Sequence, residues 1–115
     1  MITRDAGDSW SKLNCSVFTD IKAGEGFFAA SDSNIAIVGD YTWIASGGLS
    51  SRVYFSSDKG RSWDVTETPI IQGESTTGIF SISFYDKKKG YAIGGDYTKP
   101  KRDSLNKIRT TDCGK

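Results

Sequence analysis

The same short turn sequence occurs three times in this chain at nearly equal intervals, and this repeat constrains the fold more than any other feature. Each copy has the pattern Ser/Thr-x-Asp-x-Gly, and two copies continue through one more residue to Ser-Trp. The copies span residues 3–10, 56–63 and 110–115. From Asp5 to Asp58 is 53 residues, and from Asp58 to Asp112 is 54. Such a period indicates an architecture in which one supersecondary unit is copied along the chain.

The residue types of this motif are those of a hairpin turn. The Asp carboxylate can accept hydrogen bonds from N–H groups of the turn. The Gly permits a positive φ, the preceding hydroxyl can tie the turn to its strand, and the Trp can cover the hairpin and bury a large apolar area. We therefore interpret these residues as structural rather than catalytic or calcium-binding. They are Asp5, Gly7, Trp10, Asp58, Gly60, Trp63, Asp112 and Gly114.

The segments between the turns have the composition of short β-strands. They are rich in β-branched and aromatic residues, several alternate between apolar and polar types, and Gly, Asp, Asn and Ser separate them. The tetrapeptide Gly-Asp-Tyr-Thr occurs at 39–42 and again at 95–98, and we align the units on it. The sequence then predicts four antiparallel strands per unit, named A to D. The predicted strands are 27–31, 35–39, 52–56 and 63–67 in one unit, and 79–84, 91–98 and 107–110 in the next.

An all-β fold of four-stranded units repeated about every 50 residues is typical of a β-propeller. The predicted parts are the C and D strands of a first, partial blade in 1–25, a complete blade in 26–77, and strands A to C of a third blade in 78–115. The chain therefore holds slightly more than two blades, whereas a closed propeller needs at least about four. It is expected to be part of a longer propeller or, less favoured, to assemble with copies of itself into a ring.

The composition excludes several classes of function. The 15 basic residues nearly balance the 14 acidic ones, which gives no support for nucleic-acid binding. No segment approaches the roughly 18 apolar residues of a membrane span. The chain has no histidine, and its two cysteines, Cys15 and Cys113, are too far apart in the expected fold to form a disulfide. We expect no metal and no cofactor.

The turn motif resembles the Asp-box, or bacterial neuraminidase repeat, with complete matches at the first two copies and a partial match at the third. Together with Gly-Asp-Tyr-Thr, the order of segments resembles the propellers related to photosystem II stability and assembly factors. The resemblance covers nearly the whole chain. It implies a propeller whose Asp boxes lie on the face away from the usual ligand side, and a periplasmic or extracellular location if the chain follows the resembling bacterial proteins.

Sialidases share this repeat, and they use an arginine triad, a Tyr/Glu pair and an acidic proton donor. The chain has the arginines Arg4, Arg52, Arg61, Arg102 and Arg109. However, two of them lie within Asp boxes, and the Arg-Ile-Pro element that usually opens a sialidase propeller is missing. We therefore predict a non-catalytic binding or assembly module, not an enzyme. A carbohydrate-active, sialidase-like fragment and a structural repeat without a ligand are the alternatives.

The expected binding face is the one that carries the long loops. These are the B–C loops 40–51 and 96–106 and the D–A loop 68–78, and loops on a rigid scaffold are where binding groups concentrate. A protein or glycan partner is expected there. The candidate binding residues are Asp40, Tyr41, Asp96, Tyr97, Lys99 and Arg102. In the structural alternative, the repeated Asp-Tyr opens each loop, with the Asp bonded to nearby N–H groups.

Overall fold

The computed structural model describes residues 1–18, 20–28 and 31–114. It contains two antiparallel sheets and one short 3-10 helix, η1 (Cys15–Val17). The predicted all-β class is therefore confirmed. In the described residues, no helix is long and apolar enough to cross a membrane.

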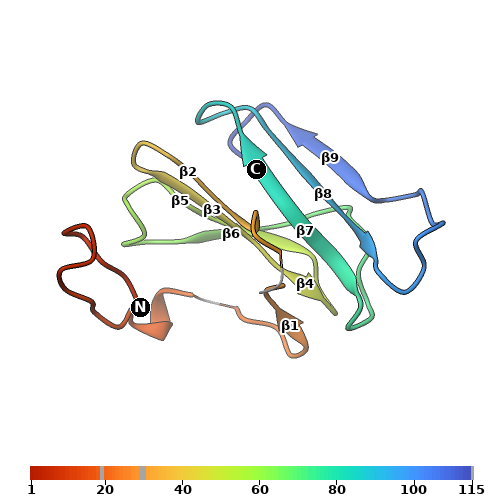
Figure 1. The fold of residues 1–115 in the computed structure, drawn as a ribbon, viewed down its shortest axis with the longest axis horizontal. Coiled ribbons are helices and arrows are strands. Elements are labelled where there is room, and N and C mark those ends of the chain that lie inside the picture. The colour runs from red at the N-terminus through yellow and green to blue at the C-terminus, as the bar shows by residue number, and fades with distance from the viewer. Residues whose placement is uncertain (19, 29–30, 115) are drawn as a thin grey trace.

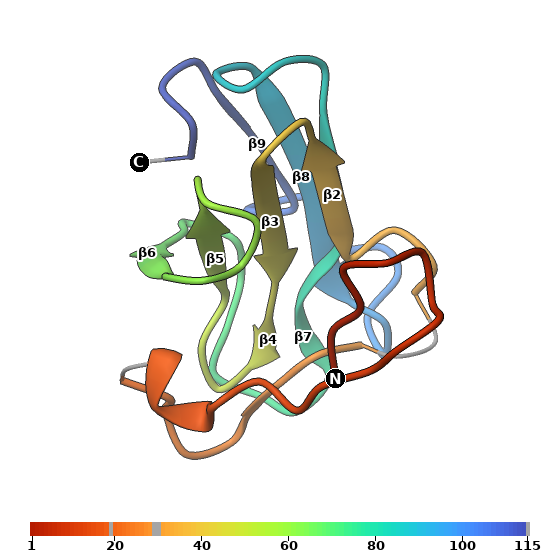
Figure 2. The ribbon, with the colours of Figure 1, turned by 90° about the vertical axis from the view of Figure 1, so that its left-hand side faces the viewer.

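The first sheet has four strands, which pair with their neighbours in the order β2-β3-β5-β6 (Figures 1 and 2). These strands are β2 (Ile35–Val38), β3 (Tyr41–Ala45), β5 (Arg52–Ser56) and β6 (Asp64–Glu67).

The second sheet has five strands in the order β1-β4-β7-β8-β9. Its main part is the meander of β7 (Thr77–Phe84), β8 (Gly90–Asp96) and β9 (Lys107–Thr110). The two-residue strands β4 (Gly47–Gly48) and β1 (Glu25–Gly26) extend it beyond β7.

Most predicted strands are confirmed, but the innermost strand of the first unit was assigned wrongly. The predictions at 52–56, 63–67, 79–84, 91–98 and 107–110 correspond to β5, β6, β7, β8 and β9. Residues 27–28 and 31 lie outside any strand, and 29–30 lie outside the described residues. The innermost strand is β2, and the stretch 40–51, predicted as a loop, contains β3 and β4. The physical reason is a tight reversal after Gly39, whose φ is 62°, which returns the chain at once as β3.

The alignment of the two Gly-Asp-Tyr-Thr copies is also wrong. Thr42 pairs with Ser56, and Gly90 pairs with Thr110. Ser56 and Thr110 are the first residues of their Asp boxes, so Thr42 and Gly90 are the equivalent positions. The first tetrapeptide therefore lies at the start of β3, whereas the second lies at the end of β8.

The hydrophobic core lies between the two sheets, with Trp43 at its centre. Trp43 is fully buried and stacks on Phe84, with ring centroids 3.7 Å apart and planes 9° apart. Its indole N–H donates to the carbonyl of Cys113 over 2.8 Å, so the polar atom of this buried ring has a partner. Ile79 and Val53 complete the contact between the sheets from β7 and β5.

The N-terminal residues lie beside the other side of the first sheet (Figure 2), but they cover it incompletely, because Ile35 and Ile37 of β2 are 49% and 66% exposed. The two residues that flank the first turn, Ile2 and Ser11, form a single β-bridge, so the predicted C and D strands of a first blade are reduced to this bridge. Both tryptophans donate their indole N–H to the Gly carbonyl of their own turn, over 3.1 Å at Trp10 and 3.2 Å at Trp63. Their burial differs: Trp63 stacks on Phe18 with centroids 5.2 Å apart, whereas Trp10 is 59% exposed and so does not bury the large apolar area expected of it.

Candidate functional site

The three Asp boxes form the same turn. In each, the Ser or Thr hydroxyl donates to the Asp carboxylate and accepts the Gly N–H, over 2.6–2.8 Å and 2.8–2.9 Å. The residue before each Gly also has a positive φ, as Ala6 (59°), Lys59 (61°) and Cys113 (73°) show. Two successive left-handed residues reverse the chain at the same place in every copy.

The Asp58 carboxylate is occupied by donors of its own turn. It accepts the N–H groups of Arg61 and Ser62 over 2.8 and 2.9 Å, and the Ser62 hydroxyl over 2.6 Å. The Ser62 hydroxyl and N–H hold the pKa of Asp58 well below its usual range. Asp5 has the same partners from Ser9, and hydrogen bonds from that residue lower its pKa to about 2. This bonding is that of a turn-forming carboxylate.

The long connections converge at the opposite end of the sheets, which we call the loop end: residues 46–51, 68–76 and 97–106. The Ile71 N–H donates to the Leu105 carbonyl over 2.9 Å, and the Gly73 N–H donates to the Gly48 carbonyl over 3.1 Å. These bonds join each connection to the next. The end that carries the Asp boxes, with turns 39–40, 57–63, 85–89 and 111–114, is called the turn end.

Asp96 fixes the start of the connection 97–106. Its carboxylate accepts the Thr98 hydroxyl over 2.6 Å and the Thr98 N–H over 3.0 Å, and its side chain is fully buried. Both bonds lower the pKa of Asp96, and the bond from the Thr98 hydroxyl has the larger effect. Lys99 lies 3.3 Å from Asp96 and 3.2 Å from Glu74, and hydrogen bonds to these two carboxylates, Glu74 first, raise the pKa of Lys99. Asp96 therefore bonds to groups of its own loop, as expected if the repeated Asp-Tyr serves to open each loop.

Tyr97, Lys99 and Arg102 are exposed at the loop end, as are Leu49, Gln72, Glu74, Lys101, Asp103 and Leu105. The Tyr97 ring is 61% exposed, and its inner side contacts the rings of Phe28 and Phe80, with centroids 6.4 and 6.5 Å away. The loop end therefore presents an anchored aromatic ring together with exposed residues of both charge signs.

Asp40 and Tyr41 do not belong to this group, because they lie at the turn end. The Asp40 carbonyl accepts the N–H of Lys59 over 2.9 Å, and its carboxylate pairs with the ammonium of Lys59 at 3.2 Å. Tyr41 packs on the aromatic cluster of the core, with its ring 6.0 Å from Trp43 and 5.9 Å from Phe55. The structure brings four of the six candidate residues to one end and separates these two, because β3 carries the chain from one end to the other.

A buried ionic cluster beside the loop end was missed by the sequence reasoning. The Arg52 guanidinium bonds to the Glu25 carboxylate, and its Nη2 donates to the Tyr54 hydroxyl over 2.9 Å. That hydroxyl donates to Glu25 over 2.9 Å, and the Ser46 hydroxyl donates to Glu25 over 2.5 Å. Arg52 and Tyr54 could have been paired from their i, i+2 spacing on one strand face, but no local pattern identifies Glu25.

The charges of this cluster are held in their ionised forms. Burial alone would raise the pKa of Glu25, but hydrogen bonds from Arg52, Ser46 and Tyr54 lower it to about 2. The hydrogen bond to Glu25 raises the pKa of Arg52, and burial followed by the bond to Glu25 raises the pKa of Tyr54 to about 12. Arg, Glu and Tyr are the residue types of a sialidase site. Here, however, the three side chains are hydrogen-bonded to one another instead of facing an open pocket.

The rest of the described chain offers no metal centre: residues 1–18, 20–28 and 31–114 hold no group of three or more carboxylate or thiol side chains arranged as ligands. Cys15 and Cys113 are free thiols. No protein-family model matches the chain, and no curated protein or solved structure matches it either.

Proposed function

We propose that this chain is a non-catalytic β-propeller module that binds a protein partner through its loop end. The observation that supports the propeller most strongly is that both sheets relate to their Asp boxes in the same way. The strand before each box pairs in one register with its inner neighbour: Trp43 lies opposite Phe55, and Tyr91 lies opposite Arg109. This shared register supports the reading of each meander as one copy of a blade.

The packing of the two copies also fits a propeller. The β2-β3-β5-β6 meander and the β7-β8-β9 meander lie face to face around one core, as neighbouring blades do (Figure 1). The turns 57–63 and 111–114 both lie at the turn end, which leaves the loop end as the face for a ligand.

The exposed side chains of the loop end favour a protein partner. Tyr97 is held in place by two aromatic neighbours, and Arg102 is an exposed cation in the same connection, 97–106. Tyr and Arg are enriched among residues that dominate binding energy in protein interfaces. The carboxylates nearby, Asp96 and Glu74, are both paired with Lys99, so they do not form the open pair that glycoside hydrolysis requires.

The test uses labelled chain on protein and glycan arrays. A protein bound by the wild type should lose at least about tenfold in affinity with Tyr97→Ala or Arg102→Ala, because a hot-spot residue contributes about 2 kcal/mol or more. Asp40→Ala is the matched control at the turn end and should bind as the wild type does. Hydrolysis of a fluorogenic sialoside by the purified chain, or binding that only Asp40→Ala weakens, would overturn the proposal.

A further inference from the structure

The connection between β8 and β9 is longer than its counterpart in the first sheet. In the first sheet the Ser46 N–H donates to the Arg52 carbonyl over 2.9 Å, and residues 47–51 lie between the two. The equivalent bond in the second sheet runs from the Gly94 N–H to the Asn106 carbonyl over 2.8 Å and encloses residues 95–105. The second connection is therefore six residues longer than the first. Such additions to a rigid scaffold are where binding groups concentrate.

Leu105, the last residue enclosed in this connection, has a backbone conformation that side chains oppose. Its φ is 55°, in the left-handed region where a Cβ atom crowds the backbone. Of the other described residues that have a positive φ and are not glycine, three lie in the Asp boxes and one is Asp20. In this conformation the Leu105 carbonyl accepts the Ile71 N–H over 2.9 Å. Glycine or asparagine would present the same carbonyl with less strain.

The first sheet shows that the blade does not require a leucine here. Counted from the Asp box, the residue equivalent to Leu105 is Ser51. Ser51 is fully buried, and its φ is not positive. Its carbonyl accepts the Thr68 N–H over 3.1 Å. The bond to the next connection therefore forms there with an ordinary backbone and a small side chain.

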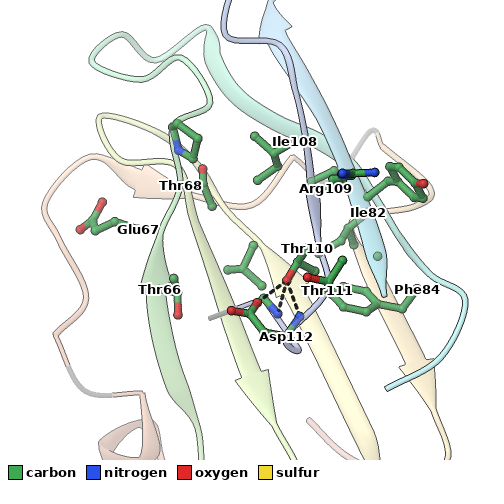
Figure 3. A pocket seen from close by; sticks show the side chains of 16 residues that line it. Thr66, Glu67, Thr68, Ile82, Phe84, Ile108, Arg109, Thr110, Thr111 and Asp112 are labelled. Atoms are coloured by element: carbon green, nitrogen blue, oxygen red, sulfur yellow. Dashed lines mark hydrogen bonds between the residues drawn. The ribbon is translucent and has the colours of Figure 1, made fainter. Parts of the chain in front are cut away.

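The Leu105 side chain does not offset the strain by packing into the protein, because it is 58% exposed. A groove of about 440 Å³ lies between the outer strands of the two sheets, with Thr66 on one side and Ile108 on the other (Figure 3), but Leu105 is not among its lining residues. An exposed apolar side chain on a strained backbone is evidence for a functional role, since strain of this kind gathers at binding sites.

We propose that Leu105 is the apolar anchor of the loop end and inserts into an apolar pocket on the partner protein. Its role rests on the loop-end binding proposed above and adds the chemistry of the partner's surface. The Ile71–Leu105 bond and the Gly94–Asn106 bond hold the residue from both sides, so little conformational freedom is lost on binding. A single leucine buries too little apolar surface to hold a chain on a lipid bilayer, which favours a protein over a membrane.

Two substitutions remove the leucine side chain without adding strain. Leu105→Gly and Leu105→Asn both suit a left-handed backbone, and the asparagine variant does not add the flexibility of glycine. We expect the urea midpoint of each variant to equal or exceed that of the wild type. Midpoints below that of the wild type for both variants would mean that the leucine stabilises the fold, and would overturn the proposal.

The binding test uses an array protein that binds the wild type and that Tyr97→Ala weakens. Leu105→Gly and Leu105→Asn should each weaken its binding about tenfold or more, because the buried leucine side chain is lost from the interface. Leu105→Met keeps the apolar volume and should bind as the wild type does. Tyr85→Ala is the matched control, because Tyr85 is 87% exposed but lies at the turn end, and it should also bind as the wild type does.

Failure of the anchor and failure of the loop end can be told apart. If the array protein binds Leu105→Gly and Leu105→Asn as it binds the wild type, Leu105 is not an anchor, and the loop end remains the binding face. If no array protein depends on Tyr97 or Arg102, both proposals are overturned. Binding to phosphatidylcholine vesicles that requires Leu105, in place of binding to a protein, would overturn the protein pocket.

Discussion

The Arg52 guanidinium and the Glu25 carboxylate form an ion pair that is almost wholly removed from water, with 1% and 2% of their side-chain surfaces exposed. The pair connects β5 of the first sheet with β1 of the second. It also anchors the N-terminal residues, because Asp20 accepts from Arg52 through both its carboxylate and its carbonyl. Such a pair adds little net stability when intact, but removing Glu25 leaves the buried Arg52 charge with a single carboxylate partner, Asp20, whose side chain is 71% exposed.

We expect Glu25→Ala to lower the free energy of unfolding by about 3 kcal/mol or more, because the Arg52 charge stays buried. Urea denaturation followed by tryptophan fluorescence measures this. The control is Glu67→Ala, whose partner Lys22 and whose own side chain are 41% and 53% exposed. It should cost less than about 1 kcal/mol. Equal losses for the two variants would contradict the buried role of Glu25.

The lowered pKa of Glu25 predicts that the stability of the chain decreases at acid pH. The pKa of Glu25 is lowered from 4.5 to about 2 in the folded protein, so its contribution to stability is present above pH 4.5 and is lost as the pH falls toward 2. The difference in unfolding free energy between the wild type and Glu25→Gln should therefore shrink over that interval. A difference that is constant from pH 6 to pH 2 would refute this assignment of the shift.

The Asp boxes are predicted to act through hydrogen bonds of their turns. Asp58→Ala removes the acceptor of two backbone N–H groups and two hydroxyls, and should lower the melting temperature. Asp8 lies in the first Asp box at the position of Arg61, and its carboxylate accepts none of the hydrogen bonds of that turn, so Asp8→Ala should leave the melting temperature unchanged. Calorimetry of the two variants checks this. An effect of Asp8→Ala as large as that of Asp58→Ala would argue against the turn-forming role.

The contact between β7 and β8 requires glycine at position 94. A Cβ placed on Gly94 would lie 1.9 Å from the Gly78 carbonyl oxygen, a backbone atom that cannot move away alone. Gly94→Ala should destabilise the chain by about 3 kcal/mol or prevent folding. At Gly26 a Cβ meets nothing within 4 Å, so Gly26→Ala should change stability by less than about 0.5 kcal/mol. Circular dichroism and urea denaturation distinguish the two variants, and a folded, fully stable Gly94→Ala would rule out this close approach.

The sequence predicted those parts of the fold that local patterns determine. The β-branched and aromatic composition of β5 and the alternation of β7 identified them as strands, and the Asp-Gly pattern identified three turns that adopt the same bonding. The error at β3 has a physical cause. The tetrapeptide Gly-Asp-Tyr-Thr is compatible both with a tight turn between strands and with the end of a strand, so its repetition did not imply structural equivalence.

The candidate site was predicted less well, because its members meet only through tertiary packing. Tyr97, Lys99 and Arg102 were expected together because they are close in the sequence. Asp40 was placed with them only through the incorrect alignment. Glu25 reaches Arg52 across 27 residues, and an isolated Glu in a Gly-rich stretch carries no local signal of such a partner.

The repeated blade on which the proposed function depends is tested most directly by nuclear Overhauser contacts between Hα protons of opposed residues. Non-hydrogen-bonded pairs of antiparallel strands bring these protons close. We predict strong contacts between Trp43 and Phe55 and between Tyr91 and Arg109, the same positions relative to the second and third Asp boxes. If Trp43 and Phe55 show no contact, and β5 instead shows contacts with β2, the two sheets are not copies of one blade.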